Sequence, residues 1–178
     1  METTKAAVDA KHLVVTALFI ALSFVGANIG IPGTTIAFDS LPAFLGALLF
    51  GPVYGAAIGF LGHLFTALTS GFPLSVPLHL VIAAAMIITM LGFGFAFKAL
   101  KGKVSQSVNF GVTAVVGVIL NGPVALAFSM GALALMAGRE AALGLLMLLP
   151  ALILASAINI VLSIILFKSL ENVWGRIK

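Results

Sequence analysis

Six apolar stretches, separated by short polar or glycine- and proline-containing segments, run along the chain. A bilayer core about 30 Å thick is crossed by roughly 20 helical residues, and most of these stretches approach that length. The predicted helices are His12–Ile29, Leu41–Phe50, Pro52–Ser70, Val76–Phe97, Val108–Met136 and Ala141–Phe167. The pattern predicts an all-α integral membrane protein, with residues 1–178 forming a single domain of six transmembrane helices.

The second stretch, Leu41–Phe50, is too short to cross a bilayer alone unless it begins near Ile36 or packs inside the protein. Gly51 and Pro52 follow it, and this pair suits a tight turn because Gly ends helices and Pro starts them. If residues 41–70 instead formed one kinked span, the chain would cross the membrane five times rather than six.

The positions of the cations favour six crossings. Eight of the nine Lys and Arg residues fall in three short patches: Lys5 and Lys11; Lys98, Lys101 and Lys103; Lys168, Arg176 and Lys178. Six crossings from a cytoplasmic N-terminus place all three patches inside and only Arg139 outside, whereas five crossings leave three cations outside. The positive-inside rule favours the first arrangement. We therefore expect a multi-pass protein of the cell membrane with both termini in the cytoplasm.

Composition supports the membrane assignment. Hydrophobic residues make up 62% of the chain and charged residues 8%, too little polar material to cover a water-soluble domain. The net charge is +4, and the Lys and Arg residues flank apolar spans. Membrane lipids are therefore the expected partner, and nucleic acid is not. The chain has no cysteine, which excludes disulfides and thiolate chemistry. The first stretch also resembles a signal peptide, but five further apolar stretches favour an uncleaved span.

Small residues recur every four positions in two places. One stripe is Ala17 and Ala21; the other is Ala43, Ala47, Gly51, Gly55 and Gly59. Small residues at this spacing allow helix backbones to approach closely in a membrane. Either stripe could pack helices within the protein or dock another membrane subunit, and composition does not distinguish these roles.

A few polar residues lie within or beside the apolar stretches, mostly toward the predicted outer side. Polar groups in a membrane are costly, so each is a functional candidate. Together with neighbouring phenylalanines they have the composition of a small-molecule site. The candidate substrate-binding residues are Asn28, Asp39, His63, Thr66, Ser70, His79 and Asn121.

Each candidate also has a structural alternative. Asp39 could cap the following helix, His79 could snorkel to the interface, and His63 could form an inter-helix hydrogen bond. The threonine and serine hydroxyls could bond to carbonyls of their own helix. Asn159, which falls toward the predicted inner half, is interpreted as a packing residue.

Motifs for catalysis and cofactors are weak. No G-x-S-x-G frames Ser70. His63, His79 and Asp39 could supply three metal ligands, but no H-E-x-x-H or i, i+4 pair presents them together. No phosphate-binding glycine loop with Lys is present either. We expect no catalytic residue, no metal site and no cofactor: the chain has the parts to bind a solute but no evident means to drive its transport.

The segment from Asp39 to Leu80, DSLPAFLGALLFGPVYGAAIGFLGHLFTALTSGFPLSVPLHL, resembles the substrate-binding S components of energy-coupling factor (ECF) vitamin transporters. The size, the six-span layout and the short basic C-terminal tail are also similar. Ala17 and Ala21 match the A-x-x-x-A motif by which S components dock on their coupling subunit. The resemblance covers essentially the whole chain.

This resemblance implies a subunit that binds a vitamin near the extracellular face, under a lid formed by the loop Gly30–Ser40. It implies a transmembrane coupling subunit and two ATPases as partners, with Ala17 and Ala21 as the docking residues. Residues 62–80 are most similar to S components assigned to α-ribazole, a cobalamin precursor. Riboflavin, pantothenate or cobalamin would use similar residue types. Two other classes stay open: an intramembrane enzyme, and an accessory membrane subunit without a small ligand.

Overall fold

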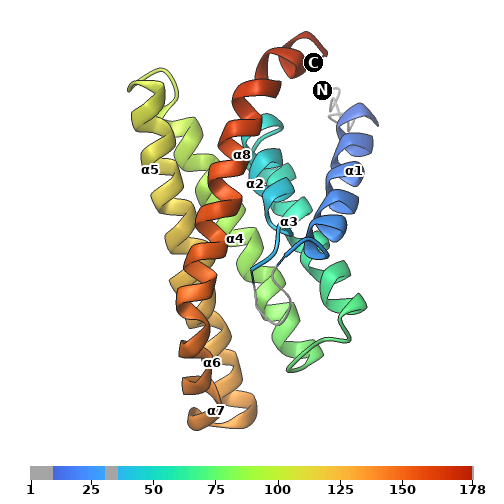
Figure 1. The fold of residues 1–178 in the computed structure, drawn as a ribbon, viewed down its shortest axis with the longest axis vertical. Coiled ribbons are helices and arrows are strands. Elements are labelled where there is room, and N and C mark those ends of the chain that lie inside the picture. The colour runs from blue at the N-terminus through green and yellow to red at the C-terminus, as the bar shows by residue number, and fades with distance from the viewer. Residues whose placement is uncertain (1–9, 31–35, 178) are drawn as a thin grey trace, which may run out of the picture.

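The computed structural model describes residues 10–30 and 36–177, in which helices and short turns form an elongated bundle (Figure 1). The helices are α1 (Ala10–Ala27), α2 (Leu41–Leu49), α3 (Pro52–Thr69), α4 (Val76–Leu100), α5 (Gln106–Ile119), α6 (Ala125–Ala137), α7 (Arg139–Gly144) and α8 (Leu149–Ile177). An isolated antiparallel bridge pairs Gly30 with Ala37. Lys5, Lys178 and residues 31–35 of the predicted lid lie outside the described ranges. The predicted all-α membrane bundle is confirmed.

Within the described residues, five helical runs are long and apolar enough to cross a membrane. They are α1, α3, α4, the run from α5 through α6, and the run from α7 through α8. A π-helical turn, Leu120–Val124, joins α5 to α6, and a 3₁₀ turn, Leu145–Leu148, joins α7 to α8. Pro123 in the π turn has no amide hydrogen, so a regular helical hydrogen bond is absent at this position.

The short helix α2 lies inside the bundle. Its nine residues extend about 14 Å, less than half of a bilayer core. Seven of the nine are buried, and Ala43 and Phe44 have no exposed surface. Gly51, with φ of 112°, separates α2 from α3, so the alternative of one kinked span over residues 41–70 is wrong. A sixth, internal helix therefore completes the arrangement predicted from the sequence.

Close contact between α2 and α3 depends on the longer stripe of small residues. A Cβ on Gly55 would lie 2.5 Å from the Ala47 Cβ, and one on Gly59 would lie 3.5 Å from the Ala43 Cβ. Larger side chains would separate the two helices, so this stripe is used for internal packing. Beneath it, the rings of Phe44 and Phe93 meet edge to face at 4.8 Å.

Aromatic side chains join the two ends of the described chain. The His12 ring stacks on Tyr54 with 5.2 Å between the ring centroids, and it meets Trp174 edge to face at 5.4 Å. The centroids of Phe50 and Trp174, also edge to face, are 4.6 Å apart. We call His12, Phe50, Tyr54 and Trp174 the terminal cluster. Because it combines the start of α1, the α2–α3 turn and the end of α8, these three lie at one end of the molecule (Figure 1).

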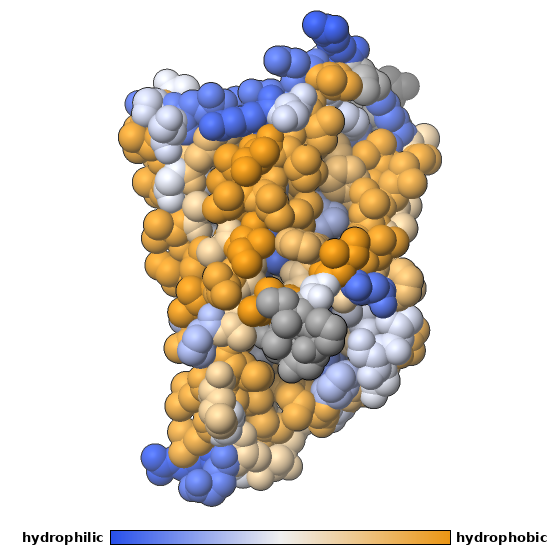
Figure 2. Space-filling model, viewed as in Figure 1, coloured by the Kyte–Doolittle hydropathy of each residue, from blue (hydrophilic) through white to orange (hydrophobic). Residues whose placement is uncertain are grey.

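Cations gather at the same end as the terminal cluster, whereas Arg139, at the start of α7, lies at the opposite end (Figure 1). A Cβ added to Gly51 would lie 3.2 Å from the Lys98 Nζ at the end of α4. The Lys11 Nζ lies over the Trp174 ring, 5.8 Å from its centroid. Figure 2 shows hydrophilic residues at both ends of the molecule and an apolar belt between them. Leu135 and Met147 are 91% and 86% exposed, as expected for side chains that face lipid.

Candidate functional site

The turn between α3 and α4 brings two of the candidate residues into direct contact. The His63 Nε2 lies 3.1 Å from the His79 Nδ1, and the His79 Nε2 lies 2.7 Å from the carbonyl oxygen of Pro73. A carbonyl oxygen only accepts hydrogen bonds, so the His79 Nε2 carries the proton and donates it. In the neutral ring the His79 Nδ1 is then an acceptor, and the His63 Nε2 donates to it. His79 therefore does more than snorkel, and the inter-helix bond considered for His63 is present.

The turn that presents Pro73 has an unusual backbone. Phe72 and Leu74, on either side of Pro73, have positive φ angles of 50° and 77°. Non-glycine residues rarely adopt this region, and such strain persists only where the surroundings hold it. The Phe72 N–H donates to the Ala67 carbonyl at 2.8 Å, and its ring meets the edge of His79 at 5.8 Å. The turn thus fixes both the carbonyl and an aromatic face against His79.

Thr66 and Ser70 accompany this histidine pair along α3. Thr66 is one turn beyond His63 on the same helix face, and its buried Oγ1 has no hydrogen-bond partner among the described residues. The back-bonding alternative is therefore wrong for Thr66; Thr69 instead donates to the carbonyls of Phe65 and Thr66. Ser70 is exposed at the C-terminal end of α3.

The described part of the predicted lid, residues 36–40, is tied to two helices. The Phe38 N–H donates to the Gly26 carbonyl at 3.0 Å, and the Asn159 Nδ2 donates to the Ala37 carbonyl at 2.8 Å. A Cβ on Gly26 would collide with the Phe38 carbonyl, so a glycine is needed for this close approach. The lid segment is therefore anchored to α1 on one side and to α8 on the other.

Asn159 was interpreted from the sequence as a packing residue, and that interpretation is incomplete. It is 1% exposed, it holds the lid segment through Ala37, and its Oδ1 is buried without a partner among the described residues. An unpaired buried amide oxygen costs free energy and is available to a ligand. The missed signal is a polar stripe on α8, in which Ser156, Asn159 and Ser163 are spaced at i, i+3 and i+7 and are all buried.

Asp39 lies in the lid segment, two residues from the Ala37 anchor. The predicted helix cap is wrong in detail, because the N-cap position belongs to Ser40 and no side chain caps this end of α2. Burial raises the pKa of the Asp39 carboxyl to about 6, and hydrogen bonds from the backbone N–H groups of Ser40 and of Asp39 itself oppose that rise. Its charge therefore changes within the physiological range.

Asn121 and Asn28 are held by other contacts. Asn121, in the π turn, donates through Nδ2 to the Ser156 Oγ at 2.9 Å, and Ser156 in turn donates to the Leu152 carbonyl at 2.6 Å. Asn121 thus bonds the run from α5 through α6 to α8. Asn28 is exposed, and its Nδ2 donates to the Phe24 carbonyl of its own helix at 2.9 Å.

The structure brings the candidates into separate groups. His63 and His79 are in contact, whereas no hydrogen bond among the described residues links them to Asp39, Asn121 or Asn28. The described part of the chain contains no group of three or more side chains able to hold a metal ion.

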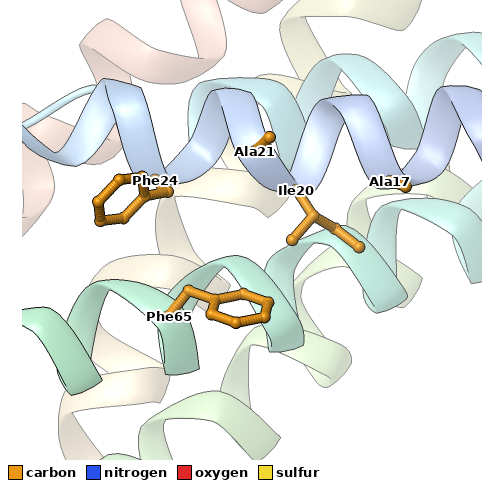
Figure 3. A pocket seen from close by; sticks show the side chains of 5 residues that line it. All are labelled: Ala17, Ile20, Ala21, Phe24 and Phe65. Atoms are coloured by element: carbon orange, nitrogen blue, oxygen red, sulfur yellow. The ribbon is translucent and has the colours of Figure 1, made fainter.

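A hollow of about 380 Å³ lies elsewhere, between α1 and α3 (Figure 3). Its lining is apolar and consists of Ala17, Ile20, Ala21, Phe24 and Phe65. Ala17 and Ala21 are exposed, unlike the small residues of α2. The A-x-x-x-A stripe is therefore not covered by any described part of the chain.

Comparison with known proteins identifies one family. The family model described as "ECF transporter, substrate-specific component" matches residues 11–171. No curated protein and no solved structure gives a significant match. The matched range begins in the first turn of α1 and ends within α8, so it includes every candidate residue above.

Proposed function

Because the chain belongs to the family of ECF transporter substrate-specific components, we propose that it captures a vitamin or vitamin precursor at the outer face of the cell membrane. Proteins of this family bind a small-molecule substrate and work with a coupling component and ATPases, so the chain is a transport subunit and not an enzyme. We infer that the cationic end, with both termini, faces the cytoplasm. The opposite half, with the histidine pair and the lid segment, then faces outward.

The observation that carries the proposal is the family match over residues 11–171. The geometry supports it, because two of the buried oxygens without partners among the described residues lie beside candidate elements: the Thr66 Oγ1 is one turn from His63, and the Asn159 Oδ1 belongs to the amide that holds the lid segment. Neither satisfies its hydrogen-bonding capacity within the described chain. A bound solute with hydroxyl or amine donors would do so, with a gain of about 1–3 kcal/mol for each group.

α-Ribazole is our preferred substrate. Its dimethylbenzimidazole ring suits aromatic faces such as that of Phe72, and its ribose suits hydrogen-bonding groups such as Asp39, Asn121 and His79. Asn28, His63, Thr66 and Ser70 complete the proposed binding set. Riboflavin, pantothenate and cobalamin present similar groups and are the alternatives to be tested beside it.

Mass spectrometry of the purified protein tests the proposal directly. We expect a vitamin-class molecule to copurify in detergent at up to one equivalent, and calorimetry to rank α-ribazole above riboflavin, pantothenate and cobalamin. Tighter binding of another vitamin would replace the substrate and keep the function. A protein that binds none of the four, or that converts the molecule it binds, would contradict the proposal in favour of an accessory subunit or an enzyme.

The raised pKa of Asp39 predicts how binding depends on pH. An ionised carboxylate is the stronger hydrogen-bond acceptor, so affinity for the substrate rises as the pH increases from 5 to 7 and Asp39 loses its proton. Asp39→Asn removes this ionisation, and we expect its affinity at pH 7 to be weaker by about 1–3 kcal/mol. Because every other ionisable group is the same in both proteins, the difference between the two calorimetric pH profiles isolates Asp39.

Glu140→Gln is the matched control, since Glu140 is an exposed carboxylate outside the proposed site. Its pH profile should overlay that of the unmodified protein. If Asp39→Asn also overlays that profile, Asp39 does not contact the substrate.

A further inference from the structure

We propose that His63 and His79 form a binding site for one divalent transition-metal ion of the zinc or copper type. The site lies at the turn between α3 and α4, away from the cationic end. This inference goes beyond the proposed vitamin binding and does not depend on it.

The spacing of the two ring nitrogens already suits a metal. Zinc–nitrogen bonds are about 2.0–2.1 Å long, so two nitrogens on one ion, at angles between octahedral and tetrahedral, are roughly 2.8–3.4 Å apart. The His63 Nε2 and the His79 Nδ1 are 3.1 Å apart. The separation of the two nitrogens therefore changes little when an ion binds, while the two rings rotate so that both lone pairs point at the ion.

The second nitrogen of His79 has the partner that metal-bound histidines usually have. A ligating imidazole commonly donates its other N–H to a carboxylate or a backbone carbonyl, which fixes the tautomer and the ring orientation. The His79 Nε2 donates to the Pro73 carbonyl at 2.7 Å, so the lone pair of Nδ1 points toward His63. For His63 to ligate through Nε2, its proton moves to Nδ1, which is the other neutral tautomer of the ring.

The backbone around Pro73 is built to hold that carbonyl. Its flanking residues, Phe72 and Leu74, both have positive φ, a conformation that concentrates at ligand clamps and active sites. The Pro73 ring also restricts its own φ. Through that carbonyl, this strained turn orients the His79 ring.

Two protein ligands leave coordination positions open. Among the described residues no third His, Asp or Glu joins the pair, so water or an atom of a bound solute completes the coordination. The unpartnered Thr66 Oγ1, one turn from His63, is available to hydrogen-bond a metal-bound water. Both histidines are half-buried, so an ion from the adjacent aqueous phase has access.

Zinc titration of tag-free, chelator-stripped protein tests the site, with no vitamin present. We expect calorimetry to detect one equivalent of Zn²⁺, and His63→Ala and His79→Ala each to weaken its binding by at least tenfold. His12→Ala is the control, because His12 lies in the terminal cluster at the opposite end and should leave zinc affinity unchanged. Unaltered zinc binding in both site variants, or no uptake by the unmodified protein at millimolar Zn²⁺, would overturn the proposal.

A second measurement needs no variant and so is independent of folding defects. Paramagnetic resonance of the unmodified protein with one equivalent of Cu²⁺ should show hyperfine coupling to two imidazole nitrogens; coupling to one or none would overturn the site. Vitamin titration in excess chelator separates the two proposals. Retained vitamin binding without a zinc site refutes the metal alone, whereas zinc binding without any vitamin refutes only the proposed function.

Discussion

Two stripes of small residues with the same four-residue spacing have opposite surroundings. On α2, Ala43 and Ala47 are 0% and 2% exposed and lie directly against the glycines of α3. On α1, Ala17 and Ala21 are exposed and line an apolar hollow beside Phe65 (Figure 3). Both stripes permit close approach of another helix, but among the described residues only the stripe on α2 packs against one.

The difference arises from where each helix lies. The short α2 is enclosed by α1, α3, α4 and α8, so each of its faces meets a neighbour. α1 is at the edge of the bundle and packs against α2 and α3 (Figure 1). In a membrane, an uncovered stripe of small residues on an edge helix is free to receive another subunit. We therefore propose Ala17 and Ala21 as the surface that docks the coupling component.

The largest effect is expected from filling the covered stripe. Gly55→Leu would place side-chain atoms against Ala47, including its backbone Cα at 2.8 Å, which cannot rotate away. Overpacking of this kind costs about 3 kcal/mol or more when backbones must separate. We expect little or no monodisperse protein in size-exclusion chromatography. Gly131→Leu, at a helical glycine with open space around it, is the control and should purify normally.

A smaller but more selective effect is expected from the uncovered stripe. Ala17→Trp and Ala21→Trp add bulk to the docking surface without entering the core, so we expect vitamin uptake to fall more than tenfold while the dissociation constant for the vitamin changes less than twofold. Val115→Trp, at an exposed position on α5, controls for a tryptophan at the lipid surface. Loss of vitamin binding together with uptake would show that the stripe stabilises the subunit itself.

The smallest effect concerns a close contact between the two helices that border the hollow. A Cβ on Gly62 of α3 would lie 2.7 Å from the Ser23 Cβ of α1. Gly62→Ala gains up to about 1 kcal/mol in helix propensity but overpacks this contact at a cost of about 1–3 kcal/mol. We expect a net loss near 1 kcal/mol, measured as a lower melting temperature in detergent. A higher melting temperature would mean that α1 moves away from α3 at little cost in free energy.

Much of the fold could be predicted because local rules decide it. The turn at Gly51 needs φ of 112°, which glycine adopts readily, and Pro52 begins α3 as predicted. The Ser75 side chain accepts the Leu78 N–H and so starts α4 at the predicted residue. The π turn was not predicted, because Asn121 and Pro123 in a uniformly apolar stretch do not indicate how the backbone absorbs a proline.

Contacts between candidate residues could be predicted only where the sequence separation is short. His63 and His79 lie on consecutive antiparallel helices joined by a short turn, and this local arrangement places them near each other. The bond from Asn159 to Ala37 joins residues 122 positions apart, and no local rule predicts that contact. Apolar helices also give little indication of which face is inward, so the role of Asn159 had to be read from the structure.

The terminal cluster gives the protein an intrinsic spectroscopic probe. The chain has one tryptophan and one tyrosine, and both belong to that cluster. Near-ultraviolet absorption and emission therefore come from a single locality, where the start of α1 and the end of α8 meet, with phenylalanine contributing weakly. When a partner binds to or leaves that locality, the absorption and emission of the unlabelled protein change. Binding at the distant histidine turn leaves both signals unchanged.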